Sequence, residues 1–270
     1  MHVIPAMDAF EALVLGIIQG LTEWLPVSSS GHLVIAEELL GLPASENLLF
    51  DLVVHLGTLL AVCTYFRKEL GRIISSLMTP KAKRDPQREA LRTLGLLLLV
   101  GTVPAAIVGV LLTNVIEDIF DLTLVGAALI ANAGFLFVAQ RLGSNGTRRN
   151  AKLLDAIVIG TFQAVAIIPG ISRSGSTLGG GMLRGLEKEI AATFAFLLSV
   201  PTLLGAFFYG LVKLDSYDLN LTMALIGFVG AFAIGLASIE YLLKAVRANK
   251  LWLFSIYCAI VGAIVIAYKL

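Results

Sequence analysis

Residues 20–32 read GLTEWLPVSSSGH and interrupt an otherwise apolar N-terminal segment with a proline, two glycines, three serines and two ionisable side chains. The apolar stretch before this break covers residues 6–25, and the one after it covers only residues 30–42. Thirteen helical residues span about 20 Å, whereas the hydrocarbon core of a bilayer is about 30 Å thick. The stretch therefore predicts a broken helix that enters a membrane without crossing it.

The composition of the whole chain is that of a membrane protein. Of its 270 residues 57% are hydrophobic and 14% charged, whereas soluble domains carry about 25% charged residues. A soluble fold is therefore excluded, and six apolar runs approach the ~20 residues that a spanning helix needs. These runs cover residues 47–66, 91–113, 122–142, 190–212, 221–243 and 251–268.

A second break has the same character as the first. Residues 169–177 read PGISRSGST; they follow an apolar helix expected over residues 153–168 and precede a short one expected over 174–185. Irregular backbone at membrane depth is tolerated only where it is buried in protein or lines a wet cavity. Both breaks are therefore candidate functional sites, each within a re-entrant helix-loop-helix pair.

An offset of 144 positions aligns the two breaks and the segments around them. Each repeat unit, residues 1–143 and 144–270, contains one re-entrant pair and three spans, so the odd number of crossings inverts the second unit. We expect an all-α integral membrane protein that forms a single membrane domain, with two inverted repeats, six full spans and two re-entrant pairs. The aligned residues are Gly16 with Gly160, Gln19 with Gln163, Ser28 with Ser172, Ser30 with Ser174, Gly31 with Gly175, Phe50 with Phe194, and Thr58 with Thr202.

The positive charges predict the orientation of the spans. Lysines and arginines cluster in residues 67–92, 141–152, 184–188 and 244–250, and the positive-inside rule assigns all four clusters to the cytoplasmic side. Both termini are then expected outside. The first cluster is interpreted as a solvated cytoplasmic loop.

The second break carries a cation at membrane depth. Burying Arg173 there costs at least ~2.5 kcal/mol without a partner, and its planar fork suits a phosphate. Backbone N–H groups at the start of the short helix favour the same ligand. The alternative is that the serines here, like Ser28 and Ser30 in the first break, only cap broken helices. The hydroxyl groups concerned belong to Ser172, Ser174, Ser176 and Thr177.

The first break contains the ingredients of an activated nucleophile. Gln19 and Glu23 lie four residues apart on one helix face, and Ser29 and His32 lie three apart at the start of the next helix. If the two faces converge, the hydroxyl group meets an imidazole or a carboxylate, which activates it. The carboxylate of Glu23 is alternatively expected to hold a metal ion.

These two motifs resemble those of the undecaprenyl-diphosphate phosphatase family of bacteria, also known as the bacitracin-resistance family. The resemblance rests on residues 19–32 and 169–177 and extends over essentially the whole chain. One departure is Gln19, where many members have a glutamate. It weakens any role that needs two carboxylates there and leaves Glu23 as the essential one.

The resemblance implies an enzyme of the bacterial plasma membrane. Its members remove the terminal phosphate of undecaprenyl diphosphate, a polyprenyl lipid, which recycles the carrier for peptidoglycan synthesis and confers bacitracin resistance. It also implies a divalent metal, magnesium or calcium, with Glu23 as a ligand, a site opening toward the outer face, and members that form homodimers. Membrane lipids are expected neighbours, and no nucleic acid is an expected partner.

The resulting hypothesis gives four residues catalytic roles. Arg173 holds the diphosphate, Ser29 is the first choice of nucleophile, His32 transfers a proton or replaces Ser29, and Glu23 is the base or metal ligand. The expected substrate-binding residues are Gln19, Ser28, Ser30, Ser172, Ser174, Gly175 and Thr177.

Two other functions compete with this hypothesis. A transporter or flippase for an anionic polyprenyl lipid would also use inverted repeats with broken helices, but it would need no nucleophile. An intramembrane serine hydrolase would leave Arg173 without a role. Release of phosphate by the pure protein discriminates between the phosphatase and the transporter.

Overall fold

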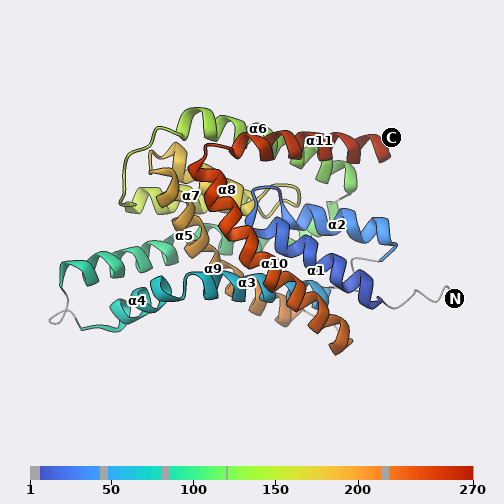
Figure 1. Ribbon diagram of the computed structural model, residues 1–270, viewed down its shortest axis with the longest axis horizontal. Helices are drawn as coiled ribbons and strands as arrows, with labels where there is room; N and C mark the ends of the chain where they lie inside the picture. Colours follow the sequence, from blue (N-terminus) through green and yellow to red (C-terminus); the bar gives the residue numbers. More distant parts are fainter. Residues whose placement is uncertain (1–6, 43–47, 81–84, 120, 214–218, 270) are drawn as a thin grey trace.

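The computed structural model describes residues 7–42, 48–80, 85–119, 121–213 and 219–269. These residues form eleven helices (Figure 1). Their bounds are α1 Ala9–Trp24, α2 Ser29–Leu40, α3 Leu48–Tyr65, α4 Arg67–Met78, α5 Pro86–Ile119, α6 Leu122–Gly143, α7 Leu153–Val165, α8 Arg173–Leu183, α9 Lys188–Lys213, α10 Leu221–Arg247 and α11 Leu251–Lys269.

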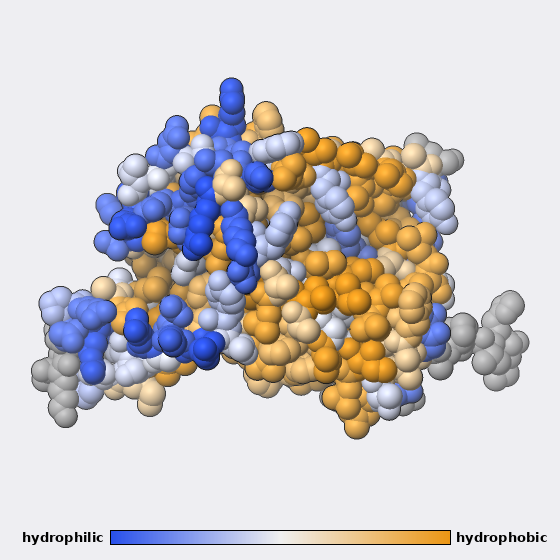
Figure 2. Space-filling view, viewed as in Figure 1, coloured by the Kyte–Doolittle hydropathy of each residue, from blue (hydrophilic) through white to orange (hydrophobic). Residues whose placement is uncertain are grey.

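Six of these helices are long and apolar enough to cross a membrane, namely α3, α5, α6, α9, α10 and α11. They coincide with the six predicted runs, which confirms a multi-pass, all-α membrane protein. Apolar side chains cover most of the visible surface, and hydrophilic ones gather at the end where α4 lies and α5 begins (Figures 1 and 2). An apolar belt with a charged end is the surface that a bilayer requires.

Both predicted breaks are present. Helix α1 ends at Trp24 because Leu25 is extended (φ −71°, ψ 147°), as a residue that precedes a proline prefers to be. Helix α2 then runs for 12 residues from Ser29. The second break separates α7 from the 11-residue helix α8. Each pair is therefore a longer and a shorter helix joined by irregular backbone.

The same polar contact recurs in both halves. The amide Nε2 of Gln19 lies 3.4 Å from Oγ1 of Thr58, and Oγ1 of Thr202 donates to Oε1 of Gln163 at 3.3 Å. In each case the two residues are 39 positions apart in the chain. This correspondence is what the repeat of 144 residues predicts.

Helix crossings at glycine pairs also correspond. A methyl group added at Gly16 would overlap with the backbone of Gly227 where α1 packs on α10, and one added at Gly160 would overlap with Gly101 where α7 packs on α5. Small residues allow two membrane helices to approach this closely. Both contacts support the repeat, whereas the opposite orientation of the two halves in a membrane stays a prediction.

The interpretation of residues 67–92 as a solvated loop is wrong. Residues 67–78 form the amphipathic helix α4, and α5 already begins at Pro86. Ile73 is buried in the core, with Leu70 and Leu77 packed against it, because these residues lie on one face of the helix. The density of charged residues in this segment concealed its apolar stripe.

Candidate active site

The two breaks meet inside the protein. The backbone N–H of Gly170 donates to Oγ of Ser28 at 3.0 Å. Gly170 has a left-handed φ of 98°, and a side chain there would collide with Ala128 and Val125 on α6. Only glycine fits this position without strain. The close approach brings the N-termini of α2 and α8 to one place.

Asn132 of α6 ties the two breaks together. Its fully buried amide donates from Nδ2 to the carbonyl oxygen of Pro26 at 3.0 Å, and its Oδ1 accepts the N–H of Ser172 at 3.1 Å. The hydroxyl of Ser174 donates to the carbonyl oxygen of Leu25 at 2.9 Å. Each break thereby satisfies backbone groups of the other, as buried polar groups require. A lone asparagine in an apolar span was the available signal for this role.

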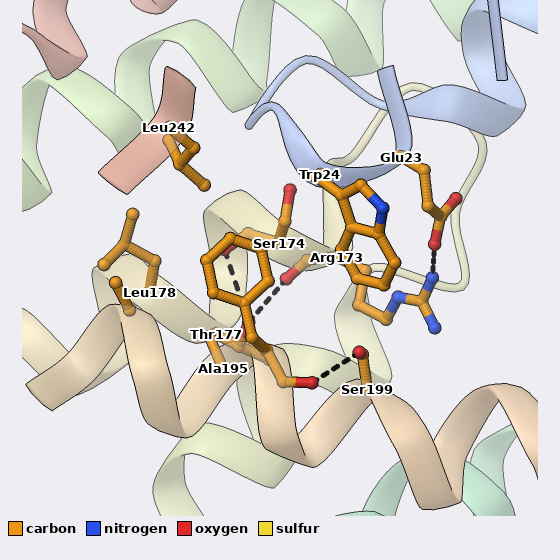
Figure 3. A pocket seen from close by; sticks show the side chains of 11 residues that line it. Glu23, Trp24, Arg173, Ser174, Thr177, Leu178, Ala195, Ser199 and Leu242 are labelled. Atoms are coloured by element: carbon orange, nitrogen blue, oxygen red, sulfur yellow. Dashed lines mark hydrogen bonds and ion pairs between the residues drawn. The ribbon is translucent and has the colours of Figure 1, made fainter. Parts of the chain in front are cut away.

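The partner of Arg173 is a carboxylate of the first break. Nη2 of Arg173, at the start of α8, forms an ion pair with Oε1 of Glu23, near the end of α1. The side chain of Glu23 is 1% exposed and that of Arg173 20%. Figure 3 shows the two side chains facing one another. The predicted need of Arg173 for an anion is met, in this state, by the protein itself.

The second carboxylate oxygen of Glu23 binds the candidate nucleophile. Its Oε2 accepts a hydrogen bond from Oγ of Ser29 at 2.6 Å and another from Nε2 of Gln19 at 3.0 Å. Nε2 of His55 lies 3.8 Å from the same oxygen. Of the two partners foreseen for the hydroxyl, the carboxylate is therefore the one it contacts. A serine hydroxyl donating to a carboxylate is poised to lose its proton.

His32 points to a different partner. Its Nδ1–H donates to the carbonyl oxygen of Ser28 at 2.7 Å, so Nε2 of the neutral ring accepts from the hydroxyl of Tyr257 at 2.8 Å. The two rings stack with their centroids 5.6 Å apart. No hydrogen bond joins His32 to Ser29 or Glu23 among the described residues. Tyr257, on α11, had no signal in the sequence.

Two serines cap the short helices in the same way. Oγ of Ser28 accepts the N–H of Gly31 at 3.3 Å, and Oγ of Ser172 accepts the N–H of Gly175 at 3.0 Å. Capping, the alternative function of these hydroxyls, is thus present in the structure. Their predicted role in substrate binding stays a prediction, as does that of Gly175.

The remaining predicted hydroxyls surround the same junction. Oγ of Ser30 lies 3.4 Å from the cap oxygen of Ser28, and Ser174 lies 3.1 Å from that of Ser172. Thr177 donates back to the carbonyl oxygen of Arg173 at 2.9 Å. Gln19, described above, completes the set of predicted substrate-binding residues. The structure therefore brings this set together around Glu23 and Arg173.

A small pocket extends inward from the ion pair. Glu23 and Arg173 lie at one end of it and Leu178 and Leu242 at the other (Figure 3). Its volume of about 10 Å³ is room for about one water molecule. A site this enclosed strengthens electrostatic interactions within it.

The residues fit a divalent cation that substrate helps to hold. Among the described residues, no group of three histidine, cysteine or acidic side chains could bind a metal ion. Magnesium, however, is commonly held by one or two carboxylates together with substrate phosphates. Glu23 supplies a carboxylate, and Oε1 of Gln19 is buried without a hydrogen-bond partner. Both are oxygen ligands of the kind that this cation prefers.

A buried acid anchors the far end of α8. The carboxylate of Asp155 accepts two hydrogen bonds from Arg148, at 2.7 and 3.0 Å, and one from Nε of Arg184 at 2.9 Å. Burial alone would raise the pKa of Asp155, but these hydrogen bonds and the charge of Arg148 outweigh it and lower the pKa to about 2. Because Arg184 caps α8, this cluster fixes the helix that carries Arg173.

Comparisons with known proteins place this chain in a family. The family described as bacitracin resistance protein BacA matches residues 12–264. The chain is 38% identical to a protein named undecaprenyl-diphosphatase from Methanosphaera stadtmanae, over 96% of this chain and 98% of the other. It is 40% identical to one of the same name from Desulfosudis oleivorans, over 96% and 97%. The chain therefore belongs to the bacitracin resistance protein BacA family.

Proposed function

We propose that this membrane protein is an undecaprenyl-diphosphate phosphatase, which hydrolyses the lipid diphosphate to undecaprenyl phosphate and inorganic phosphate. The reaction recycles the lipid carrier and accounts for the bacitracin resistance in the family's name. The observation that carries the proposal is the carboxylate of Glu23, which binds the hydroxyl of Ser29 with one oxygen and Arg173 with the other.

Ser29 is the nucleophile in this proposal. Its oxygen attacks the terminal phosphorus while Glu23 takes the hydroxyl proton. The bond between that phosphorus and the bridging oxygen breaks, and Glu23 passes the proton to the departing lipid phosphate. Water then attacks the phosphoserine and gives its proton to Glu23, which returns it to the oxygen of Ser29 as phosphate leaves.

Arg173 stabilises the charge on the transferred phosphoryl group. Nη2 makes the contact with Glu23, and among the described residues the other N–H groups of the guanidinium have no partner, which leaves them to bind phosphate oxygens. The N-termini of α2 and α8 add two positive helix ends at the same junction. Phosphoryl transfer depends mainly on such positioning and electrostatic stabilisation.

A magnesium or calcium ion completes the proposed site. Glu23 and the unpaired carbonyl oxygen of Gln19 would hold it together with the substrate. When bound, the ion would neutralise part of the negative charge of the diphosphate. His32 is proposed to hold a proton near the departing phosphate.

The proposed orientation puts both termini and the opening of the site on the outer face of the plasma membrane. Two observations support it: the four basic clusters fall on one side by the positive-inside rule, and α1 begins and α11 ends opposite the hydrophilic end (Figures 1 and 2). A homodimer is part of the same proposal through the family resemblance.

The decisive experiment is phosphate release from undecaprenyl diphosphate by detergent-purified protein with magnesium. We expect release by the wild type and none by Arg173→Ala, because the charge on the phosphoryl group is then unopposed. Absence of release by folded wild type that still binds the lipid would instead favour a lipid transporter.

The nucleophile is tested separately with two neighbouring serines. Ser29→Ala should abolish turnover and the phosphoserine that mass spectrometry would detect after rapid quenching. Ser30→Ala is the comparison: Ser30 is an expected substrate-binding hydroxyl that contacts Ser28 and not Glu23, so its loss should raise KM while the phosphoserine still forms. Full activity of Ser29→Ala would assign the attack to water or to His32.

A further inference from the structure

A second cavity lies far from the ion pair, at the end of α6 and the turn between α10 and α11. Its volume is about 480 Å³, within the range of small-molecule sites. It lies in one of the basic clusters that the positive-inside rule assigns to the cytoplasmic side. The lining residues are Phe137, Gln140, Arg141, Ser144, Asn145, Asn249 and Trp252.

The floor of this cavity is rigidly built. Gln140 donates from Nε2 to the carbonyl oxygen of Asn249 at 2.9 Å and accepts the N–H of Trp252 at 2.7 Å. Lys188 donates to the side-chain oxygen of Asn249 at 2.5 Å. Asn249 has a left-handed φ of 56°, and its two contacts with Gln140 and Lys188 hold this conformation in place. The cavity therefore exists before any ligand binds.

Three polar side chains of the lining remain available to a ligand: one cation and two groups that can donate or accept hydrogen bonds. In the described part of the chain, the side chains of Arg141, Ser144 and Asn145 make no hydrogen bond or ion pair. The lining contains one cation and no carboxylate. The acid on the neighbouring helix, Glu189, is neutralised by Arg247 at 3.2 Å. This imbalance selects an anion.

The rim of the cavity is apolar and continues into the membrane-facing surface. Phe137 and Trp252 are 59% and 43% exposed. A lipid whose anionic headgroup binds in the cavity would place its acyl chains within reach of these side chains. Tryptophan at this level is typical of the membrane interface, and basic pockets between helices on the cytoplasmic side bind anionic headgroups.

We propose that this cavity binds the phosphate headgroup of an anionic phospholipid. Arg141 receives the phosphate oxygens in its planar fork, Ser144 and Asn145 donate to the remaining oxygens, and Phe137 with Trp252 contacts the first carbons of the acyl chains. The site is separate from the phosphatase site and does not depend on turnover.

Thermal unfolding of the detergent-purified protein, titrated with short-chain lipids, tests this site. Dioctanoyl phosphatidylglycerol should raise the unfolding midpoint of the wild type, whereas the phosphatidylcholine with the same chains should not. Arg141→Gln should need about five- to tenfold more phosphatidylglycerol, as the loss of one cation near anionic lipid predicts. Arg141→Lys keeps the charge but loses the planar fork, so the phosphatidylglycerol concentration that it needs should lie between those of the wild type and Arg141→Gln. It replaces Arg141→Gln in the test if that variant fails to fold.

Arg72→Gln is the matched control. Arg72 lies on α4 in another basic cluster, is exposed and lines no part of the cavity, so its removal changes net charge equally. The proposal would be overturned if Arg72→Gln weakened the response to phosphatidylglycerol as much as Arg141→Gln does. It would also be overturned if phosphatidylcholine raised the unfolding midpoint as much as phosphatidylglycerol. Protection by inorganic phosphate alone, equal to that by phosphatidylglycerol, would also overturn it and would identify a free-phosphate site.

Discussion

The two breaks use one scaffold for different chemistry. Each places a serine before a short helix, and each serine accepts the N–H of a glycine three positions on. The first helical residue then differs: it is Ser29 in the first break and Arg173, 144 positions later, in the second. Ser28 has a left-handed φ of 71°, whereas Ser172 has an ordinary φ of −79°.

The difference shows how the site is divided between the halves. The first half supplies the acceptor Glu23 and the hydroxyl group, and the second half supplies the cation. Neither half is complete, because a buried carboxylate and a buried guanidinium each need the other. Of the two capping serines only Ser28, in the half that carries the proposed nucleophile, has a positive φ, and residues in such conformations often cluster at functional sites.

The largest expected effect comes from removing either charge. Glu23→Gln and Arg173→Gln should each lower phosphate release by at least about 10³-fold and destabilise the fold by about 3–5 kcal/mol, because the remaining charge is buried and unpaired. The double variant should be inactive yet destabilised by less than the sum. A double-mutant cycle on unfolding in detergent measures this coupling.

An exposed pair on the charged surface provides the control for that cycle. Arg149 and Glu187 lie 2.8 Å apart, with the arginine side chain 76% exposed. Their coupling should be at most about 1 kcal/mol, and activity should be unchanged when both are replaced by glutamine. Equal coupling energies for the Glu23–Arg173 and Arg149–Glu187 pairs would show that burial does not make the site pair stronger than a surface pair.

The next effect concerns the contact that joins the breaks. Asn132→Leu leaves the carbonyl of Pro26 and the N–H of Ser172 unsatisfied, at about 1–3 kcal/mol each. Asn132→Asp keeps an acceptor for Ser172 but buries a carboxylate against the carbonyl oxygen of Pro26, so it should be at least as destabilising. We expect kcat to fall more than KM rises in both, measured beside unfolding. Unchanged kcat in a destabilised Asn132→Leu would make the contact structural only.

A smaller effect separates corresponding acids in the first helices of the two halves, α1 and α7. Asp155 corresponds by the repeat to Glu11, which lies in an exposed capping box with Asp8. The pKa of Asp155 is about 2, below its ordinary value near 3.9. Its contribution, about 2 kcal/mol, is therefore present above pH 4 and lost as pH falls through 2.

The pH dependence is measured as the urea midpoint between pH 5 and pH 2. Asp155→Asn should remove much of the acid-induced loss, while Glu11→Gln should leave it nearly unchanged. Identical profiles for wild type and Asp155→Asn would show that other carboxylates govern acid unfolding.

Much of the fold and of the site followed from sequence because both depend on local patterns. Apolar runs of membrane length gave the six spans, and a proline with serines and glycine gave each break. The need of Arg173 for an anion was also predicted, but the expected anion was a phosphate, whereas the structure supplies the carboxylate of Glu23. Roles in catalysis stay predictions.

The sequence could not predict which way a side chain points or which residues far apart in the chain contact one another. His32 turns to Tyr257, 225 positions away, and a helical spacing of three from Ser29 does not specify which way a ring rotates. Asn132 connects two loops that are far apart in the chain. The apolar face of α4 is recognisable from its packing, because Ile73 is buried in the core where α4 lies against α5.

The smallest effect tests whether the left-handed backbone of Ser28 is strained. Ser172→Ala should cost about 1 kcal/mol, the usual loss of a helix cap. Ser28→Ala should cost more, because it also removes the acceptor of the N–H of Gly170. A glycine variant at either position also lacks the hydroxyl, but it relieves backbone strain only at position 28. The glycine variant should therefore exceed the alanine variant in stability by about 1 kcal/mol more at position 28 than at position 172. Unfolding of the four variants in detergent gives this double difference. A value of zero would mean that the two breaks differ in chemistry alone and that the first is not held in a strained conformation.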